Sequence, residues 1–224
     1  MASVIISSIG KKLLMSIAGI FLILFLLVHM GINLLVILFD DPMVYNRAAH
    51  FMSSSIVIKV FEILLFGGFL LHILYALILQ VQNWLARPKR HRKYNFSNTS
   101  FFSKFMIHTA AIIGVFLVIH LIDFYFKAKF GKGSEIIYEG VVYHDFAGEV
   151  IRKFQMPGFV IFYILSFLFL GFHLLHGFQS AFKTFGLYDL KYARSINILG
   201  LVYTIIVVTG FSIIPIIIYF TQPA

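Results

Sequence analysis

The sequence contains no cysteine among its 224 residues. Without thiols the chain forms neither disulfides nor thiolate-held iron–sulfur clusters, and it lacks the Cys-x-x-Cys-His attachment of c-type haem. Any cofactor must therefore be held non-covalently or through His, Asp, Glu or Met.

Charged residues are also scarce, at 12% of the chain. Soluble domains have roughly a quarter. The apolar residues make up 60% and gather in runs of the length that crosses a bilayer. These runs cover approximately residues 13–39, 57–81, 106–126, 158–182 and 196–220. Because backbone polar groups in lipid must be satisfied within the segment, we predict an all-α fold: a single domain over residues 1–224, an integral membrane bundle of five transmembrane helices.

The net charge is +9. We attribute this excess of Lys and Arg to the orientation of the chain in the membrane rather than to nucleic-acid binding. Lys and Arg concentrate in cytoplasmic loops of membrane proteins. Here they gather before the first span, after the second and after the fourth: Lys11, Lys12, Arg87, Lys89, Arg90, Arg92, Lys93, Lys183, Lys191 and Arg194. We therefore expect a cytoplasmic N-terminus and a C-terminus outside. The segment 40–56 is expected to be an outer loop, and 145–154 a short interfacial helix in the outer segment 127–157. The first apolar run is too long for the core of a cleavable signal peptide.

Nine histidines occur, and five of them lie deep in apolar runs: His29, His72, His120, His173 and His176. An ionisable residue inside a span is costly and normally faces the protein interior, where it has a function. For any single histidine, a hydrogen bond to a neighbouring helix is an equally good explanation. Because each of the first four spans contains such a histidine, we infer that these histidines have a common function.

The depths of four of these histidines sort them into two pairs. At about 1.5 Å per residue, His29 lies about 24 Å from the inner end of its span and about 15 Å from the outer end. His120 is likewise nearer the outer end. His72 and His173, on spans that run the other way, are both nearer the inner end. This predicts an outer pair, His29 with His120, and an inner pair, His72 with His173.

Two imidazoles at one depth are typical of b-type haem, because the porphyrin supplies the other four iron ligands. Zinc or non-haem iron would need three or four protein ligands at one point. Carboxylates to complete such a site are missing from the middle of the spans, since Glu62 and Asp123 lie near span ends. We therefore predict two haems b, four iron ligands and a haem-binding bundle of the first four helices. Iron held on both axial sides has no open position for oxygen, which favours electron transfer.

These residues resemble the membrane cytochrome b subunit of succinate dehydrogenase and fumarate reductase, of the five-helix, two-haem type. The resemblance covers nearly the whole chain. It rests on the entry around Lys12, Met15, Ser16 and Gly19, on Phe25-Leu-x-x-His29 and Phe116-Leu-x-x-His120, on Glu62 and His72, and above all on the stretch from Gly171 to Phe182. In this family the fourth-helix ligand precedes a glycine by four residues. That rule selects His173, with Gly177, and leaves His176 as a haem contact or alternative ligand.

The resemblance implies a function and partners. A flavoprotein subunit with FAD would interconvert succinate and fumarate, and an iron–sulfur subunit would carry electrons to the inner haem on the cytoplasmic side. The outer haem would follow, with a quinone, usually menaquinone, as the membrane substrate. Asn33, Asn46, His50 and Glu62 are candidates for contacting the quinone. The expected location is the bacterial inner membrane. Some members carry a proton-conducting glutamate two residues before the fourth ligand; here Gly171 stands there, and we expect no such path.

Two other classes of function stay open on the sequence. A cytochrome b subunit of another membrane oxidoreductase, such as a hydrogenase or formate dehydrogenase, would share the haems without the fourth-helix motif. A haem-free membrane anchor or transporter would use the histidines as polar contacts or proton relays. Broken helices and midplane carboxylates would favour transport, and the sequence shows neither.

Overall fold

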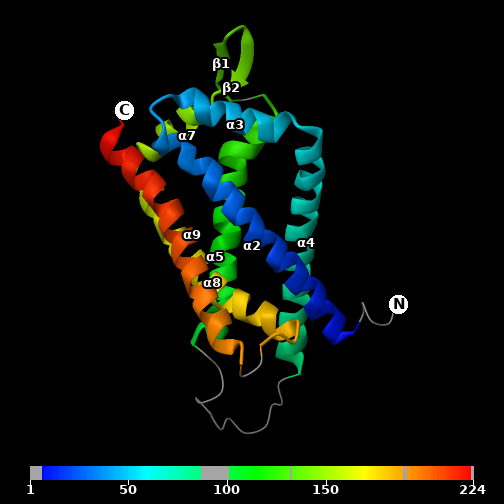
Figure 1. Ribbon diagram of the computed structural model, residues 1–224. Coiled ribbons are helices and arrows are strands. Elements are labelled where there is room, and N and C mark those ends of the chain that lie inside the picture. The colour runs from blue at the N-terminus through cyan, green and yellow to red at the C-terminus, as the bar shows by residue number, and fades with distance from the viewer. Residues whose placement is uncertain (1–6, 87–100, 132, 189–190, 223–224) are drawn as a thin grey trace.

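Five long apolar helices form the body of the protein in the computed structural model (Figure 1). The structure describes residues 7–86, 101–131, 133–188 and 191–222. In chain order the long helices are α2 (Ser8–Leu38), α4 (Ile56–Leu85), α5 (Phe101–His120) with its continuation through η1 (Leu121–Phe126) and α6 (Lys127–Lys129), α8 (Pro157–Thr184) and α9 (Ala193–Thr221). Their number and positions agree with the five predicted spans, and they make the chain a multi-pass membrane protein.

Several helix ends extend beyond the predicted spans, and two of them have evident local reasons. The first helix begins at Ser8 rather than near residue 13, because the Ser7 hydroxyl accepts a hydrogen bond from the Gly10 amide at 3.0 Å. The third reaches Lys129 through η1, a π-helix, in which one turn takes in more residues than an α-helical turn.

Short elements cap one end of the bundle, and we call this the outer end after its predicted orientation (Figure 1). The segment 40–56, expected to be a loop, contains the helix α3 (Pro42–Ser54) instead. Asp41 accepts from the Met43 amide at 2.9 Å, and Pro42 stands in the first turn, where a missing N–H costs nothing. The segment 145–154, expected to be a short interfacial helix, forms the helix α7 (Phe146–Phe154), and its place at the membrane interface stays a prediction.

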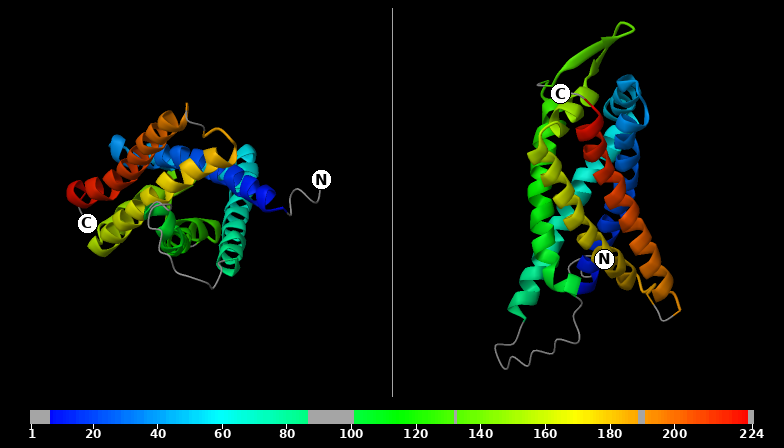
Figure 2. Two further views of the ribbon diagram at one scale, coloured as in Figure 1. Left: turned by 90° about the horizontal axis from the view of Figure 1, so that it is seen from below. Right: turned by 90° about the vertical axis from the view of Figure 1, so that its left-hand side faces the viewer.

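A two-stranded antiparallel hairpin, β1 (Glu135–Tyr138) and β2 (Val141–His144), adds a small β element to the all-α fold. Glu135 pairs with His144, and Tyr138 with Val141. The turn between the strands is formed by Glu139 and Gly140, both with positive φ, as two-residue hairpin turns require. The hairpin projects beyond the outer end of the bundle (Figure 2).

The first four long helices pack unevenly. α2 is central and contacts α4, α8 and α9, whereas α5 packs along α8. Among the described residues, α4 packs along α2 and against α3, and its backbone approaches α5 and α8 only sparsely. No residue of α4 is buried. α4 is therefore the least enclosed of the long helices.

The fifth helix, α9, belongs to the packed core rather than to its periphery. It packs against α8 and α2, and Val207 and Ile218 on it are fully buried. The Tyr203 hydroxyl donates to the Ile23 carbonyl of α2 at 2.7 Å. Gly171 of α8 permits the close approach of α9, because a Cβ there would lie 2.8 Å from Cγ2 of Val208. The predicted bundle of the first four helices thus has a fifth member, which is more buried than α2, α4 or α5.

The opposite, inner end collects the start of α2, the end of α4, the start of α5 and the connection from α8 to α9 (Figures 1 and 2). Lys11, Lys12, Lys183, Lys191 and Arg194 therefore lie at one end of the molecule. The predicted cluster Arg87, Lys89, Arg90, Arg92 and Lys93 falls outside the described residues. That this end faces the cytoplasm stays a prediction.

Candidate functional site

The structure brings His29 of α2 and His120 of α5 face to edge at the outer level of the bundle. Their ring centres are 5.8 Å apart, and the ring planes are nearly perpendicular at 87°. His120 is the last residue of α5 before the π-helix η1. The proximity expected from the depths of these two histidines is thus present.

Aromatic rings enclose this outer pair. Phe25 stacks on His29 with ring centres 5.2 Å apart, and Phe116 stacks on His120 at 5.6 Å. The remaining rings around the pair are Phe124, Tyr163 and Phe211. Phe25 and Phe116 each stand one turn before their histidine, so the repeated Phe-Leu-x-x-His pattern produces the same stacked contact twice.

The inner pair, His72 of α4 and His173 of α8, also meets. The ring centres are 6.3 Å apart and the planes are inclined at 69°. Nδ1 of His72 lies 3.4 Å from the Met15 carbonyl oxygen of α2, which orients the imidazole as a carbonyl partner orients many metal-bound histidines. Gly19 faces the same ring: a Cβ there would be 3.6 Å from Cε1 of His72.

The distance between ring centres in both pairs is close to that of two imidazoles bound to one iron. Metal–imidazole bonds are about 2 Å long and the ring centre lies about 1 Å further back, so two imidazoles on opposite sides of one iron have ring centres about 6 Å apart. In each pair one buried nitrogen, Nδ1 of His120 and Nδ1 of His173, has no hydrogen-bond partner. Such buried, unpaired polar atoms are rare and call for an explanation. Among the described side chains, no three of His, Asp or Glu converge as metal ligands.

His176 lies one turn beyond His173 on α8 and is half-buried. Within the described part of the chain its ring contacts no other histidine, whereas His173 contacts His72. The ring that meets His72 is thus that of His173. That His173, rather than His176, is the iron ligand stays a prediction.

The backbone and side chain around His29 form a short polar relay. Asn33 donates to the His29 carbonyl at 2.8 Å, and the Tyr45 hydroxyl of α3 donates to Oδ1 of Asn33 at 3.2 Å. Nδ2 of Asn33 also lies 3.5 Å from ring nitrogens of His29. Burial raises the pKa of Tyr45 well above its usual range, so this hydroxyl stays a donor. α3, missed from the sequence, thus helps to position the outer pair.

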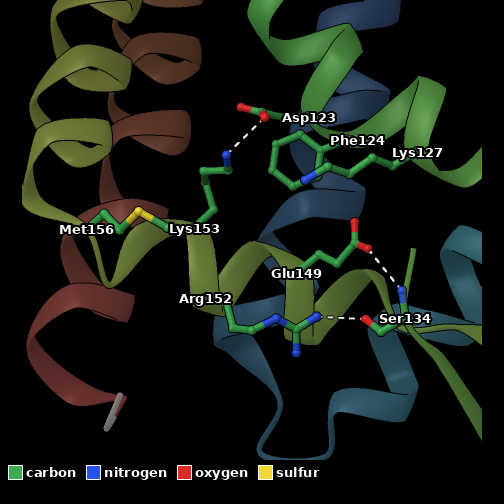
Figure 3. A pocket seen from close by; sticks show the side chains of 8 residues that line it. All are labelled: Asp123, Phe124, Lys127, Ser134, Glu149, Arg152, Lys153 and Met156. Atoms are coloured by element: carbon green, nitrogen blue, oxygen red, sulfur yellow. Dashed lines mark hydrogen bonds and ion pairs between the residues drawn. The ribbon is translucent and has the colours of Figure 1, made fainter. Parts of the chain in front are cut away.

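A polar pocket of about 530 Å³ lies beyond the outer pair (Figure 3). It is lined by Asp123, Phe124, Lys127, Ser134, Glu149, Arg152, Lys153 and Met156. Asp123 pairs with Lys153 of α7 at 2.9 Å, and both side chains are largely buried. One oxygen each of Asp123 and Glu149 is buried without a hydrogen-bond partner. The feature of the sequence that points to this pocket is the carboxylate of Asp123, about one helical turn after His120.

The residues expected to contact a quinone have defined partners. Asn46 is fully buried, accepts from the Ala147 amide at 2.8 Å and donates to Asp145 at 3.2 Å, so it joins α3 to α7. Glu62 accepts from the Tyr125 hydroxyl and pairs with Lys129 at 3.1 Å. His50 lies edge-on to Tyr143 of the hairpin. That any of Asn33, Asn46, His50 and Glu62 contacts a quinone stays a prediction.

No family model, curated protein or solved structure matches this chain. The fold itself defines the class, a membrane protein of five long apolar helices. Within that class, the site is defined by two facing histidine pairs from four helices.

Proposed function

We propose that this chain is the di-haem b membrane anchor subunit of a succinate:quinone oxidoreductase, that is, of a succinate dehydrogenase or fumarate reductase. The observation that supports it most is the placement of four histidines from four helices as two facing pairs at two levels. His29 and His120 hold the outer haem, and His72 and His173 the inner one. A b haem with two imidazole ligands supplies one-electron transfer without an open position for oxygen.

The other residues of the site hold and shield these ligands. The Met15 carbonyl orients His72, while Asn33 and Tyr45 fix the backbone that carries His29. The aromatic rings around the outer pair exclude water from His29 and His120. Fixed, water-poor surroundings keep the ligands in one geometry during electron transfer.

The proposed partners follow from the two ends of the bundle. The iron–sulfur subunit, carrying electrons from the flavoprotein with its FAD, docks at the basic inner end, next to the inner pair. A quinone, most simply menaquinone, reacts in the membrane domain, and the complex lies in the bacterial inner membrane. Quinone reduction consumes protons together with electrons. Asp123 and Glu149, in the pocket beyond His120, are carboxylates that can deliver protons there.

A haem count on the purified full chain tests the proposal. A pyridine haemochrome assay, quantified against protein, is expected to give two b haems per chain. His72→Ala and His120→Ala should each leave one. His108→Ala is the matched control, because His108 is an exposed span histidine outside both pairs, and it should leave both haems. His176→Ala should also leave both if His173 is the ligand.

The complex as isolated from native membranes tests the partners. Flavin and iron–sulfur subunits should co-purify and reduce quinone with succinate. Haem without these subunits would favour the cytochrome b of another oxidoreductase. No haem in the freshly isolated native complex would refute the electron-transfer proposal and favour a haem-free anchor or transporter.

A further inference from the structure

A second hollow lies at the inner end, far along α8 and α9 from the polar pocket. It has a volume of about 340 Å³ and is lined by Phe182, Leu187, Tyr192, Ser195, Ile196 and Leu199. The last turn of α8, the first turns of α9 and the connection between them build it. Leu187, Tyr192 and Leu199 are half exposed. The hollow is therefore an apolar groove that opens to the surroundings where two membrane helices end.

Cations flank the residues of this groove in the sequence. Lys183 follows Phe182 directly, Lys191 precedes Tyr192, and Arg194 precedes Ser195. All three side chains are exposed. The ammonium of Lys183 lies 4.6 Å from the centre of the Tyr188 ring, a contact that holds it beside the α8–α9 connection. From residue 157 to residue 224 the sequence has a single acid, Asp189, which lies outside the described residues.

This combination specifies an occupant with an apolar chain and an anionic head. Basic pockets between membrane helices bind anionic lipid headgroups, and Tyr188 and Tyr192 stand where aromatic side chains meet the headgroup level of a bilayer. A soluble anion would gain no favourable contact from an apolar groove. A neutral lipid would gain no favourable contact from three cations. We propose that the groove holds an acyl chain of one anionic phospholipid, whose phosphate contacts Lys183 and Arg194.

The bound lipid would hold the ends of α8 and α9 together at their connection. α8 carries His173, and its contact with α9 is the most extensive between any two described helices. A lipid that bridges the ends of both helices would hold this contact at its inner end, where no short helix or strand among the described residues covers it. The inference does not depend on the haem proposal, because none of the groove residues is a proposed iron ligand.

Lipid binding to the full chain in detergent tests the inference. After delipidation, native mass spectrometry and thermal unfolding would be followed while phosphatidylglycerol is added. One phosphatidylglycerol per chain should be retained and should raise the unfolding temperature. Phosphatidylcholine with the same acyl chains, and inorganic phosphate alone, should do neither.

Two variants locate the site. Lys183→Gln/Arg194→Gln should reduce retained phosphatidylglycerol at least fivefold, and Ser195→Phe, which fills the groove but keeps the cations, should do the same. Lys11→Gln/Lys12→Gln is the matched control, because it removes the same charge from the same end. Equal loss in this control, equal binding of phosphatidylcholine, stabilisation by phosphate alone, or unchanged binding in both groove variants would each overturn the inference.

Discussion

The outer and inner histidine pairs have nearly the same ring spacing but very different surroundings. Around His29 and His120, five aromatic rings and the helices α3 and α7 close the structure. The inner pair depends on α4, which has no buried residue and packs mainly along α2. The outer pair thus lies in a closely packed part of the protein. On the α4 side of the inner pair, protein packing contributes little stabilisation.

This difference indicates how each pair depends on its surroundings. Removal of a well-packed side chain leaves a cavity, and its cost depends on how far the neighbours can collapse. At the outer pair the neighbours are rigid rings. At the inner pair, a group held between His72 and His173 would itself connect α4 to α8. We therefore expect outer-pair variants to impair folding, and inner-pair variants to impair mainly the connection between these helices.

The largest effect should come from substitution of the histidines themselves. His72→Ala should abolish electron transfer from succinate to quinone and remove one haem, while the chain still accumulates in the membrane. His120→Ala should remove the other haem and also lower the amount of folded chain, because it opens a cavity among rings. Quinone-reduction assays with immunoblots of membranes would measure both. Equal accumulation of the two variants would remove the contrast between the pairs.

The next largest effect should come from the ion pair at the outer pocket. Lys153→Met leaves the largely buried Asp123 carboxylate without its cation, and should cost about 3 kcal/mol of unfolding free energy. Asp123→Asn/Lys153→Met should recover most of this loss, since no unpaired charge remains. Lys127→Met, in the same pocket but in no ion pair among the described residues, should change stability by less than about 0.5 kcal/mol. Denaturant titration in detergent would measure each.

A smaller effect is expected from loss of the hydrogen bond that holds the outer end of α4. The Tyr125 hydroxyl donates to the Glu62 carboxylate, and hydrogen bonds to charged groups contribute about 1.5 kcal/mol. Tyr125→Phe should lower stability by about that amount and speed release of the inner haem more than the outer. Tyr75→Phe is the control on α4, because its hydroxyl makes no hydrogen bond among the described residues. Unchanged haem release in Tyr125→Phe would mean that α4 is held elsewhere.

The smallest effect should be that of Tyr203→Phe. The lost hydrogen bond to the Ile23 carbonyl joins two neutral groups, so the expected cost is about 1 kcal/mol. α9 should stay in place because its buried apolar face is intact. Tyr219→Phe, at an exposed position on the same helix, should have no measurable effect on the unfolding midpoint. A loss of several kcal/mol in Tyr203→Phe would show that this one bond fixes α9.

The sequence predicted the helices and the meeting of the histidines because both follow from local rules. Span length is set by the bilayer, and a fixed rise per residue converts positions such as 29 and 120 into depths. Iron ligation by these residues stays a prediction. α3 was missed although Asp41 followed by Pro42 is a recognisable helix start, since the polar composition of 40–56 favoured a loop.

Other features depend on contacts that no local pattern contains. The pairing of Asp123 with Lys153 joins helices that are separate in the chain, and the central place of α9 follows from its packing on α2 and α8. The hairpin had a weak signal, Glu139-Gly140, whose turn becomes recognisable only when the flanking strands are known. Such features need the assembled structure.

The π-helical turn at Leu121–Phe126 also has a consequence for how this helix can change. In a regular α-helix, one inserted residue would rotate everything beyond it by about 100°. A π turn contains one residue more than the α turn that it replaces, so it takes up such a residue within a single wider turn. Deletion of a single residue there would therefore restore a regular helix and leave both His120 and the residues beyond the turn, Tyr125 and Lys129 included, close to their present orientation. The turn thus absorbs an extra residue while the helix on both sides of it keeps its register.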